Sequence, residues 1–333
     1  MVPTAIRTTP LQAENAPGPW PHRLAWLAAL AAVPLVLFGG SVTTLGAGMA
    51  VDGWLVAEGH FLLFFPVDQW LRDTATFVEH THRLFGVLVG MFALTSALAT
   101  LVRERRRGAR LVAVAALLAV CLQGTLGGMR VLADDANLAF LHGALAQAVF
   151  ALLCVNAAVL SSGWRAACSQ GAEVESERRA LESAASLALL VTCVQVVLGA
   201  WYRHGIRPGH AGDVGLRLAL HVAGAIAALI ALAALARRGS ALRERAPSLP
   251  VGLHRVLARL PVLLVVQLVL GGLAWAGHRE GALGPAEWAL SIAHVLLGAL
   301  LLAHCALAAA WTRRLGRAPG LLEPVPTLCE AAP

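Results

Sequence analysis

Residues 111–133 read LVAVAALLAVCLQGTLGGMRVLA, an apolar run that contains a single charged side chain. About 20 apolar residues are enough to cross a bilayer as a helix. Seven other runs of similar length and composition occur in the chain. We therefore predict an all-α, polytopic membrane protein with eight transmembrane helices, at approximately residues 24–47, 77–102, 111–133, 138–161, 180–201, 214–236, 256–276 and 286–311.

The composition agrees with this class of protein. Of the 333 residues, 58% are hydrophobic and 14% are charged, and the mean hydropathy is +0.70. A soluble domain carries about 25% charged residues. Because the apolar residues also come in long blocks rather than in alternating patterns, the composition excludes a soluble enzyme, a disordered chain and a β-barrel porin.

The positive charges indicate an orientation in the membrane. All 26 basic residues are arginine, and they form short clusters between the apolar runs instead of one nucleic-acid-binding patch. Clusters at residues 103–110, 237–245 and 313–317 predict cytoplasmic segments, whereas acids balance the arginines at residues 130–135 and 279–287. We therefore expect a multi-pass protein of a bacterial-type inner (plasma) membrane, with the lipid bilayer as partner, no nucleic acid, and both termini in the cytoplasm.

A repeated motif divides the chain into two units. Residues 122–128 (LQGTLGG) resemble residues 266–272 (VQLVLGG) at an offset of 144, and residues 194–199 (VQVVLG) are related to both. Close helix packing with an interhelical amide explains the motif without any ligand. The repeat predicts two four-helix bundles related by a pseudo-two-fold axis along the membrane normal. The expected parts are a cytoplasmic tail (1–23), an N-terminal bundle (24–161), a cytoplasmic linker (162–179), a C-terminal bundle (180–311) and a second tail (312–333).

Four histidines lie near the starts of the even-numbered predicted spans, namely His82, His142, His221 and His294. The repeat relates them at offsets of 139 and 152, which places two imidazoles at similar depth in each bundle. A single intramembrane histidine is explained equally well by a structural hydrogen bond, but a repeated set favours a ligand site. Zinc or copper would recruit thiolates or carboxylates, whereas one histidine from each of two neighbouring helices matches axial ligation of haem iron.

One carboxylate distinguishes the two predicted sites. Glu79 stands three residues before His82, on the same helix face, whereas Leu218 occupies that place before His221. A carboxylate beside a haem ligand could accept protons or position water, so we expect a reaction site in the first bundle and an electron relay in the second. An ion pair between Glu79 and Arg83, four residues further on, is the structural alternative.

The segment Glu79-His-Thr-His82-Arg83, the histidines that open the fourth, sixth and eighth spans, and the four-plus-four repeat together resemble the haem A synthase family over about residues 24–311. The resemblance implies an inner-membrane oxidoreductase that oxidises the C8 methyl group of haem O to a formyl group, which makes haem A for terminal oxidases. It implies Glu79 as the catalytic carboxylate, His82 and His142 as axial ligands of the substrate haem, and His221 and His294 as axial ligands of a haem b cofactor.

The resemblance also implies partners, and the chain departs from the family in two places. Expected partners are the farnesyltransferase that produces haem O, terminal oxidase assembly proteins and an electron acceptor that the sequence does not identify.

Residues 49–78 lack the cysteine pair of some members, and residues 39–44 (GGSVTT) lack the family's Thr-Arg. We take Arg83, Arg130 and Arg217 as candidate partners of haem propionates, with interfacial snorkelling as the alternative.

Two other functions remain open at this point. A di-haem b-type cytochrome that transfers electrons between quinol and another carrier accounts for the four histidines but not for the difference between Glu79 and Leu218. A transporter would bind its substrate near the midplane at broken helices, where the sequence offers little charge.

Overall fold

The computed structural model of the chain describes residues 18–167, 175–205, 213–245, 249–279 and 284–316. Within these ranges, eight helices are long and apolar enough to cross a membrane, which confirms the predicted fold class. They are α2 (Trp20–Thr44), α4 (Thr74–Arg103), α5 (Arg107–Leu132), α6 (Ala136–Val159), α8 (Glu175–Gly205), α9 (Val214–Arg245), α10 (Val251–Arg279) and α11 (Pro285–Gly316).

Several helices continue past the predicted apolar spans. Helix α9 runs to Arg245, so its arginines after residue 236 extend a helix instead of forming a connection, and α8 begins at Glu175, inside the predicted linker. Hydropathy marks only the part of a helix that needs lipid, whereas Ala, Leu, Glu and Arg continue a helix in water. Most of the predicted tails and part of the linker, at residues 1–17, 317–333 and 168–174, lie outside the described residues.

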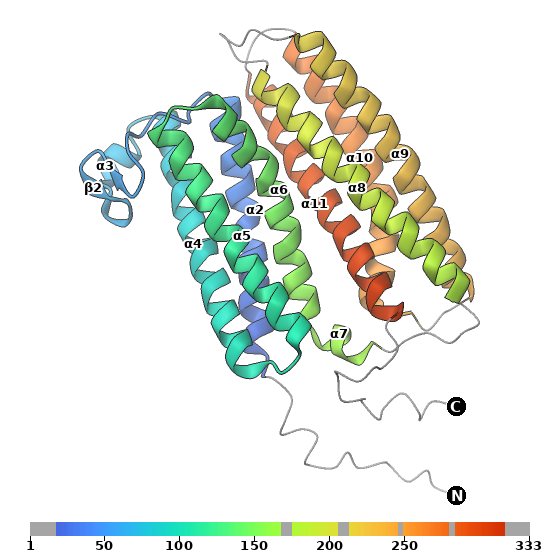
Figure 1. Cartoon of the computed structure of the whole chain (residues 1–333). Coiled ribbons are helices and arrows are strands. Elements are labelled where there is room, and N and C mark those ends of the chain that lie inside the picture. The colour runs from blue at the N-terminus through green and yellow to red at the C-terminus, as the bar shows by residue number, and fades with distance from the viewer. Residues whose placement is uncertain (1–17, 168–174, 206–212, 246–248, 280–283, 317–333) are drawn as a thin grey trace, which may run out of the picture.

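The connection between α2 and α4 has structure of its own (Figure 1). A short antiparallel hairpin of β1 (Val56–Ala57) and β2 (His60–Phe61) is followed by the 3-10 turn η1 (Leu62–Phe64) and by α3 (Val67–Trp70). We call this end of the molecule the hairpin end. The opposite end, where α2 begins, α11 finishes and the short helix α7 (Ser162–Ala166) lies, is the terminal end.

The helices gather into two groups that lie side by side (Figure 1). Helices α2, α4, α5 and α6 form one group, and α8 to α11 form the other. Helix α11 contacts α6 and α2 across the junction, and α6 also contacts α8. These neighbours are the ones expected of the predicted pseudo-two-fold repeat, which itself remains a prediction.

Large apolar side chains cover much of the outward surface of the helices. Examples are Leu111, Ile230 and Val262, whose exposed fractions are 70%, 65% and 64%. A soluble monomer rarely exposes so much contiguous apolar surface. Because each backbone polar group inside a helix is already paired, this surface is suited to lipid tails, and the chain is a multi-pass membrane protein.

Candidate functional site

The four histidines meet in pairs, one pair in each helix group. His82 on α4 faces His142 on α6, with 6.3 Å between ring centroids and 85° between ring planes. His221 on α9 faces His294 on α11, at 6.4 Å and again 85°. The two pairs predicted from the repeat are therefore brought together by the fold with nearly the same geometry.

This spacing fits two imidazoles on opposite sides of one metal ion. With metal–imidazole bonds of about 2.0 Å and an imidazole radius of about 1.1 Å, the two centroids would lie about 6 Å apart. Among the described residues, no group of three or more His, Cys, Asp or Glu side chains could hold a bare metal ion. A pair of axial imidazoles therefore suits a metal whose other ligands come from a macrocycle, as in haem.

A glycine on the preceding helix packs against each histidine ring, and we call these four residues the packing glycines. A Cβ atom added to any of them would lie 2.7–2.9 Å from Cε1 of the facing imidazole, which is closer than real Cβ atoms approach. The pairs are Gly39 with His82, Gly127 with His142, Gly199 with His221 and Gly271 with His294. The absence of a side chain at these positions lets the ring lie flat on the neighbouring helix.

The residue four positions before each packing glycine also contacts the histidine, and we call these four residues the bridging positions. They are Leu35, Gln123, Gln195 and Gln267. The backbone carbonyl of Leu35 lies 3.0 Å from Nδ1 of His82, and that of Gln123 lies 3.1 Å from Nδ1 of His142. A proton on Nδ1 that is donated to a carbonyl leaves Nε2 free to bind a metal.

The glutamine side chains add further contacts at three of the four histidines. Gln123 donates to the backbone carbonyl of His142 at 2.9 Å, and Gln195 donates to that of His221 at 3.0 Å. The amide nitrogen of Gln267 lies 3.4 Å from Nε2 of His294, whose Nδ1 is buried without a hydrogen-bond partner. Two of these amides thus join the histidine-bearing helix to its neighbour at the histidine itself.

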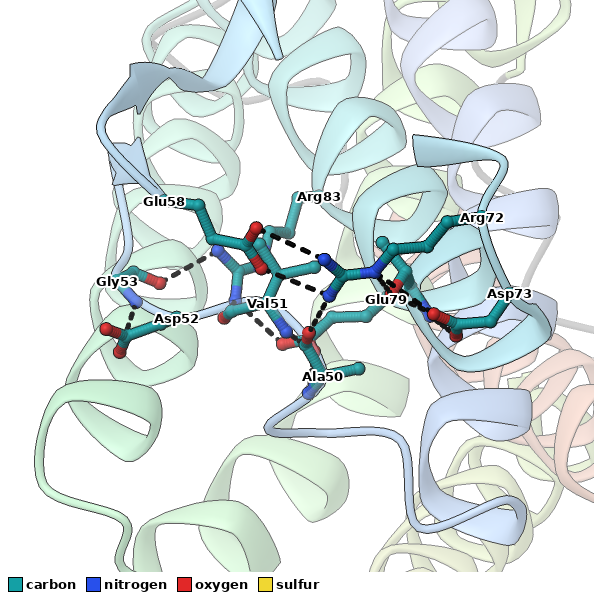
Figure 2. Close-up of polar contacts among 10 residues, drawn as sticks. Ala50, Val51, Asp52, Gly53, Glu58, Arg72, Asp73, Glu79 and Arg83 are labelled. Carbon is teal, nitrogen blue, oxygen red and sulfur yellow. Dashed lines mark hydrogen bonds and ion pairs between the residues drawn. The ribbon is translucent and has the colours of Figure 1, made fainter. Parts of the chain in front are cut away.

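Glu79 lies at the hairpin end of the first group, and its side chain is 1% exposed. Its Oε2 accepts hydrogen bonds from the backbone N–H groups of Ala50 and Val51 at 2.7 and 3.0 Å. Its Oε1 lies 2.7 Å from a guanidinium nitrogen of Arg83 and 4.0 Å from one of Arg130 (Figure 2 shows the Arg83 contact). The ion pair that the sequence offered as the structural alternative is therefore present, and the carboxylate also anchors the loop that follows α2.

The same cluster fixes the loop from a second side. Arg83 donates to the carbonyls of Gly53 and Val51 at 2.8 and 2.7 Å, as Figure 2 shows. Further out, Arg72 pairs with Glu58 of the hairpin turn at 3.2 Å. Glu79, Arg83 and residues 50–53 thus form one compact polar layer at the hairpin end of the first group.

The candidate propionate partners occupy different surroundings. Arg83 is committed to the loop and to Glu79, and the Arg130 side chain, 14% exposed, stands beside them. Arg217 in the second group lies over the ring of Trp201, 4.9 Å from its centroid, and donates to the Trp201 carbonyl at 3.3 Å. All three lie towards the hairpin end of their helices. Arg83 directly follows His82, Arg217 stands four residues before His221, and Arg130 stands three residues after the packing glycine Gly127.

Some residues of this arrangement were not assigned from the sequence. The sequence indicates helix packing for the glutamines and for three of the packing glycines, Gly127, Gly199 and Gly271, although the spacing Gln-x-x-x-Gly, which recurs in three helices, is a usable signal. Arg203 was missed altogether. It reaches from α8 to α2, where it donates to the carbonyl of Gly40 at 2.6 Å and to the hydroxyl of Thr44. A contact between helices so distant in sequence leaves no local pattern.

Over the residues that the structure describes, the fold and the site define a class: a membrane protein with eight long apolar helices and two pairs of facing imidazoles. A family model named COX15-CtaA and described as cytochrome oxidase assembly protein matches residues 22–207, more than half of the chain. The chain therefore belongs to this family, which is the haem A synthase family. The matched range contains Glu79, His82 and His142, and ends before His221 and His294. No curated protein matches the chain.

Proposed function

We propose that the protein is a haem A synthase, an oxidoreductase that converts the C8 methyl group of haem O into a formyl group. The observation that carries the proposal is the pair of imidazole sites with matching geometry, of which one has a buried carboxylate three residues before its histidine. Membership of a cytochrome oxidase assembly family supports a product that terminal oxidases need.

In this proposal, His82 and His142 would hold the iron of the substrate haem O, and His221 and His294 would hold haem b. Haem b supplies one-electron redox chemistry when it is bound. The packing glycines and the bridging positions hold the imidazoles in place before any ligand arrives. Preorganisation of this kind reduces the cost of binding.

We assign to Glu79 the acceptance of protons released as the methyl group is oxidised through an alcohol and a hydrated aldehyde that loses water. In this scheme water supplies the oxygen, and the electrons pass to the proposed electron acceptor. Two backbone N–H groups and two arginines surround its oxygens, and these contacts hold the carboxylate in one position. The loop at residues 50–53 contacts Glu79, whose side chain is 1% exposed, and would keep bulk water away from this carboxylate.

Replacement of Glu79 tests this role against its anchoring role. In Glu79→Gln, one amide oxygen can still accept from Ala50 and Val51, so the loop keeps its main contact while the base is lost. We expect haem O to bind but formyl formation to fall by about a hundredfold or more. The measurement is extraction and mass analysis of the porphyrins after coexpression with a source of haem O. Full conversion to haem A by Glu79→Gln would refute the catalytic assignment.

A di-haem b-type cytochrome is the second candidate, because both imidazole pairs have the same geometry and the oxygens of Glu79 already have loop and arginine partners. The same porphyrin analysis separates the two functions. Formyl or hydroxymethyl haem supports the synthase, whereas protohaem alone in the presence of haem O supports the cytochrome.

The remaining assignments are part of the same proposal. Arginines crowd the terminal end, as at Arg103 and Arg313, and this charge favours a cytoplasmic terminal end in an inner membrane. Arg130 and Arg217 would meet haem propionates at the hairpin end. The proposed partners are the haem O-producing farnesyltransferase, terminal oxidase assembly proteins and an electron acceptor.

A further inference from the structure

The two histidines of the first group differ in how many hydrogen bonds tie them to the neighbouring helix. On the α5–α6 side, Gln123 donates to the backbone carbonyl of His142 at 2.9 Å, and its carbonyl lies 3.1 Å from Nδ1 of the same residue. On the α2–α4 side, Leu35 offers its carbonyl to His82 at 3.0 Å, but its side chain has no hydrogen-bonding group. His142 therefore has one more tie to its neighbouring helix than His82 has.

The second group shows that this difference is not imposed by the geometry of the pair. Gln195 occupies the bridging position opposite His221 and donates to its backbone carbonyl at 3.0 Å, as Gln123 does for His142. Leu35 instead packs its side chain against an apolar cluster that includes Ala28, Val89 and Phe150. The amide is thus replaced by an apolar contact at one of the two histidines that face the proposed substrate.

We propose that His82 is the ligand that releases the iron when haem O enters and haem A leaves, while His142 stays bound. This inference rests on the proposed function, because only a substrate haem must exchange in every turnover. In the exchange step the bond between iron and Nε2 of His82 breaks, and its electron pair returns to the imidazole nitrogen without any change in oxidation state. His142, tied to α5 by the Gln123 amide, keeps the porphyrin in place until His82 binds again.

The test uses haemin as the probe and the purified full chain in lipid nanodiscs. Excess apomyoglobin captures haemin that dissociates, and its absorbance change reports the rates. We expect two phases, a fast one from the first group and a slow one from the second. Leu35→Gln introduces the missing amide and should slow the fast phase about fivefold, the effect of roughly one hydrogen bond. Leu30→Gln, which places an amide on the exposed face of the same helix α2, is the matched control and should leave both phases unchanged.

Reciprocal variants keep the test decisive if Leu35→Gln fails to fold. Gln123→Leu should accelerate the fast phase about fivefold and leave the slow phase alone, whereas Gln195→Leu should accelerate the slow phase alone. The inference is overturned if Leu35→Gln leaves the fast phase unchanged, or if Gln123→Leu does so. A wild-type chain that gives no bis-imidazole haemin spectrum would remove the proposed function as well. Normal binding with unaltered rates would remove this inference alone.

Discussion

The two histidine pairs are nearly identical in geometry and different in their surroundings. The centroid distances are 6.3 and 6.4 Å, the angle is 85° in both pairs, and a packing glycine lies against every ring. The first pair adds Glu79 and Arg83, where the second has Leu218 and Val222. The comparison teaches that a metal-binding framework is shared, and that the chemistry proposed for one copy comes from the polar layer attached to it.

The largest expected effect comes from the removal of one histidine from either pair. His221→Ala should abolish formyl formation while the first group still binds haem O, and His82→Ala should spare the haem b of the second group. Each variant should therefore lose the bis-imidazole spectrum of one site and keep that of the other, because an axial ligand is gone from one site only. The absorbance spectrum of the bound haem and mass analysis of the product measure the two effects. Undiminished haem A production by His221→Ala would reverse the assignment of the two sites.

Substitution of a packing glycine should disturb either pair less than the loss of a histidine. In Gly127→Ala and Gly271→Ala, the new methyl group would push the facing imidazole away, and we expect haem retention at that site to weaken about tenfold or more. Gly124→Ala and Gly272→Ala are matched controls, since a Cβ at either position meets nothing within 4 Å. Haemin titration of the four variants checks the expectation, and equal affinities throughout would show that the rings do not need the glycines.

The polar layer itself should matter for stability in the first group alone. Arg83→Met leaves the buried Glu79 without its 2.7 Å partner, and breaking a buried pair in this way costs about 3–5 kcal/mol. Val222→Met, at the equivalent position, should cost far less. Thermal unfolding in one detergent compares them. The double variant Glu79→Gln with Arg83→Met should recover part of the loss, and strictly additive losses would count against a direct pair.

The smallest expected effect concerns the beginnings of α4 and α9, which are capped alike. Asp73 accepts from the backbone N–H of Thr76 at 2.8 Å, and Asp213 accepts from that of Leu216 at 2.9 Å. Ala at either position should lower Tm slightly and by similar amounts. A markedly larger loss in one of the two variants would show that the caps are not equivalent.

Asp73 also carries a pH dependence. The hydrogen bond from the backbone of Thr76 lowers the pKa of the Asp73 carboxyl below its usual range. Its contribution to stability is therefore complete above the ordinary aspartate pKa and is lost as the pH falls through the lowered value. The Tm difference between wild type and Asp73→Ala should shrink below about pH 4. A difference that stays constant down to pH 2 would contradict this assignment.

The sequence predicted the fold class because hydropathy acts over whole spans, and it predicted the histidine pairs because a repeat places equivalent residues at equivalent depth. It did not predict where α8 begins or where α9 ends, since helix continuation in water does not depend on apolar residues.

The sequence also did not predict most of the groups that contact Glu79. The sequence could suggest Arg83 from its i+4 spacing, but the N–H groups of Ala50 and Val51 come from a loop whose path no local pattern specifies. The role of Gly127 was hidden for a similar reason: a glycine in an apolar helix predicts close approach without saying what approaches.

The contact of Arg203 with Gly40 and Thr44 bears on how the protein is made. The helix that carries Gly39, and with it the packing surface for His82, is synthesised before α8. The packing around the first histidine pair is therefore complete only after α8 has inserted. A ribosome stalled before α8 would hold α2 and α4 to α6 without this contact, so ligand loading is expected to follow synthesis of α8.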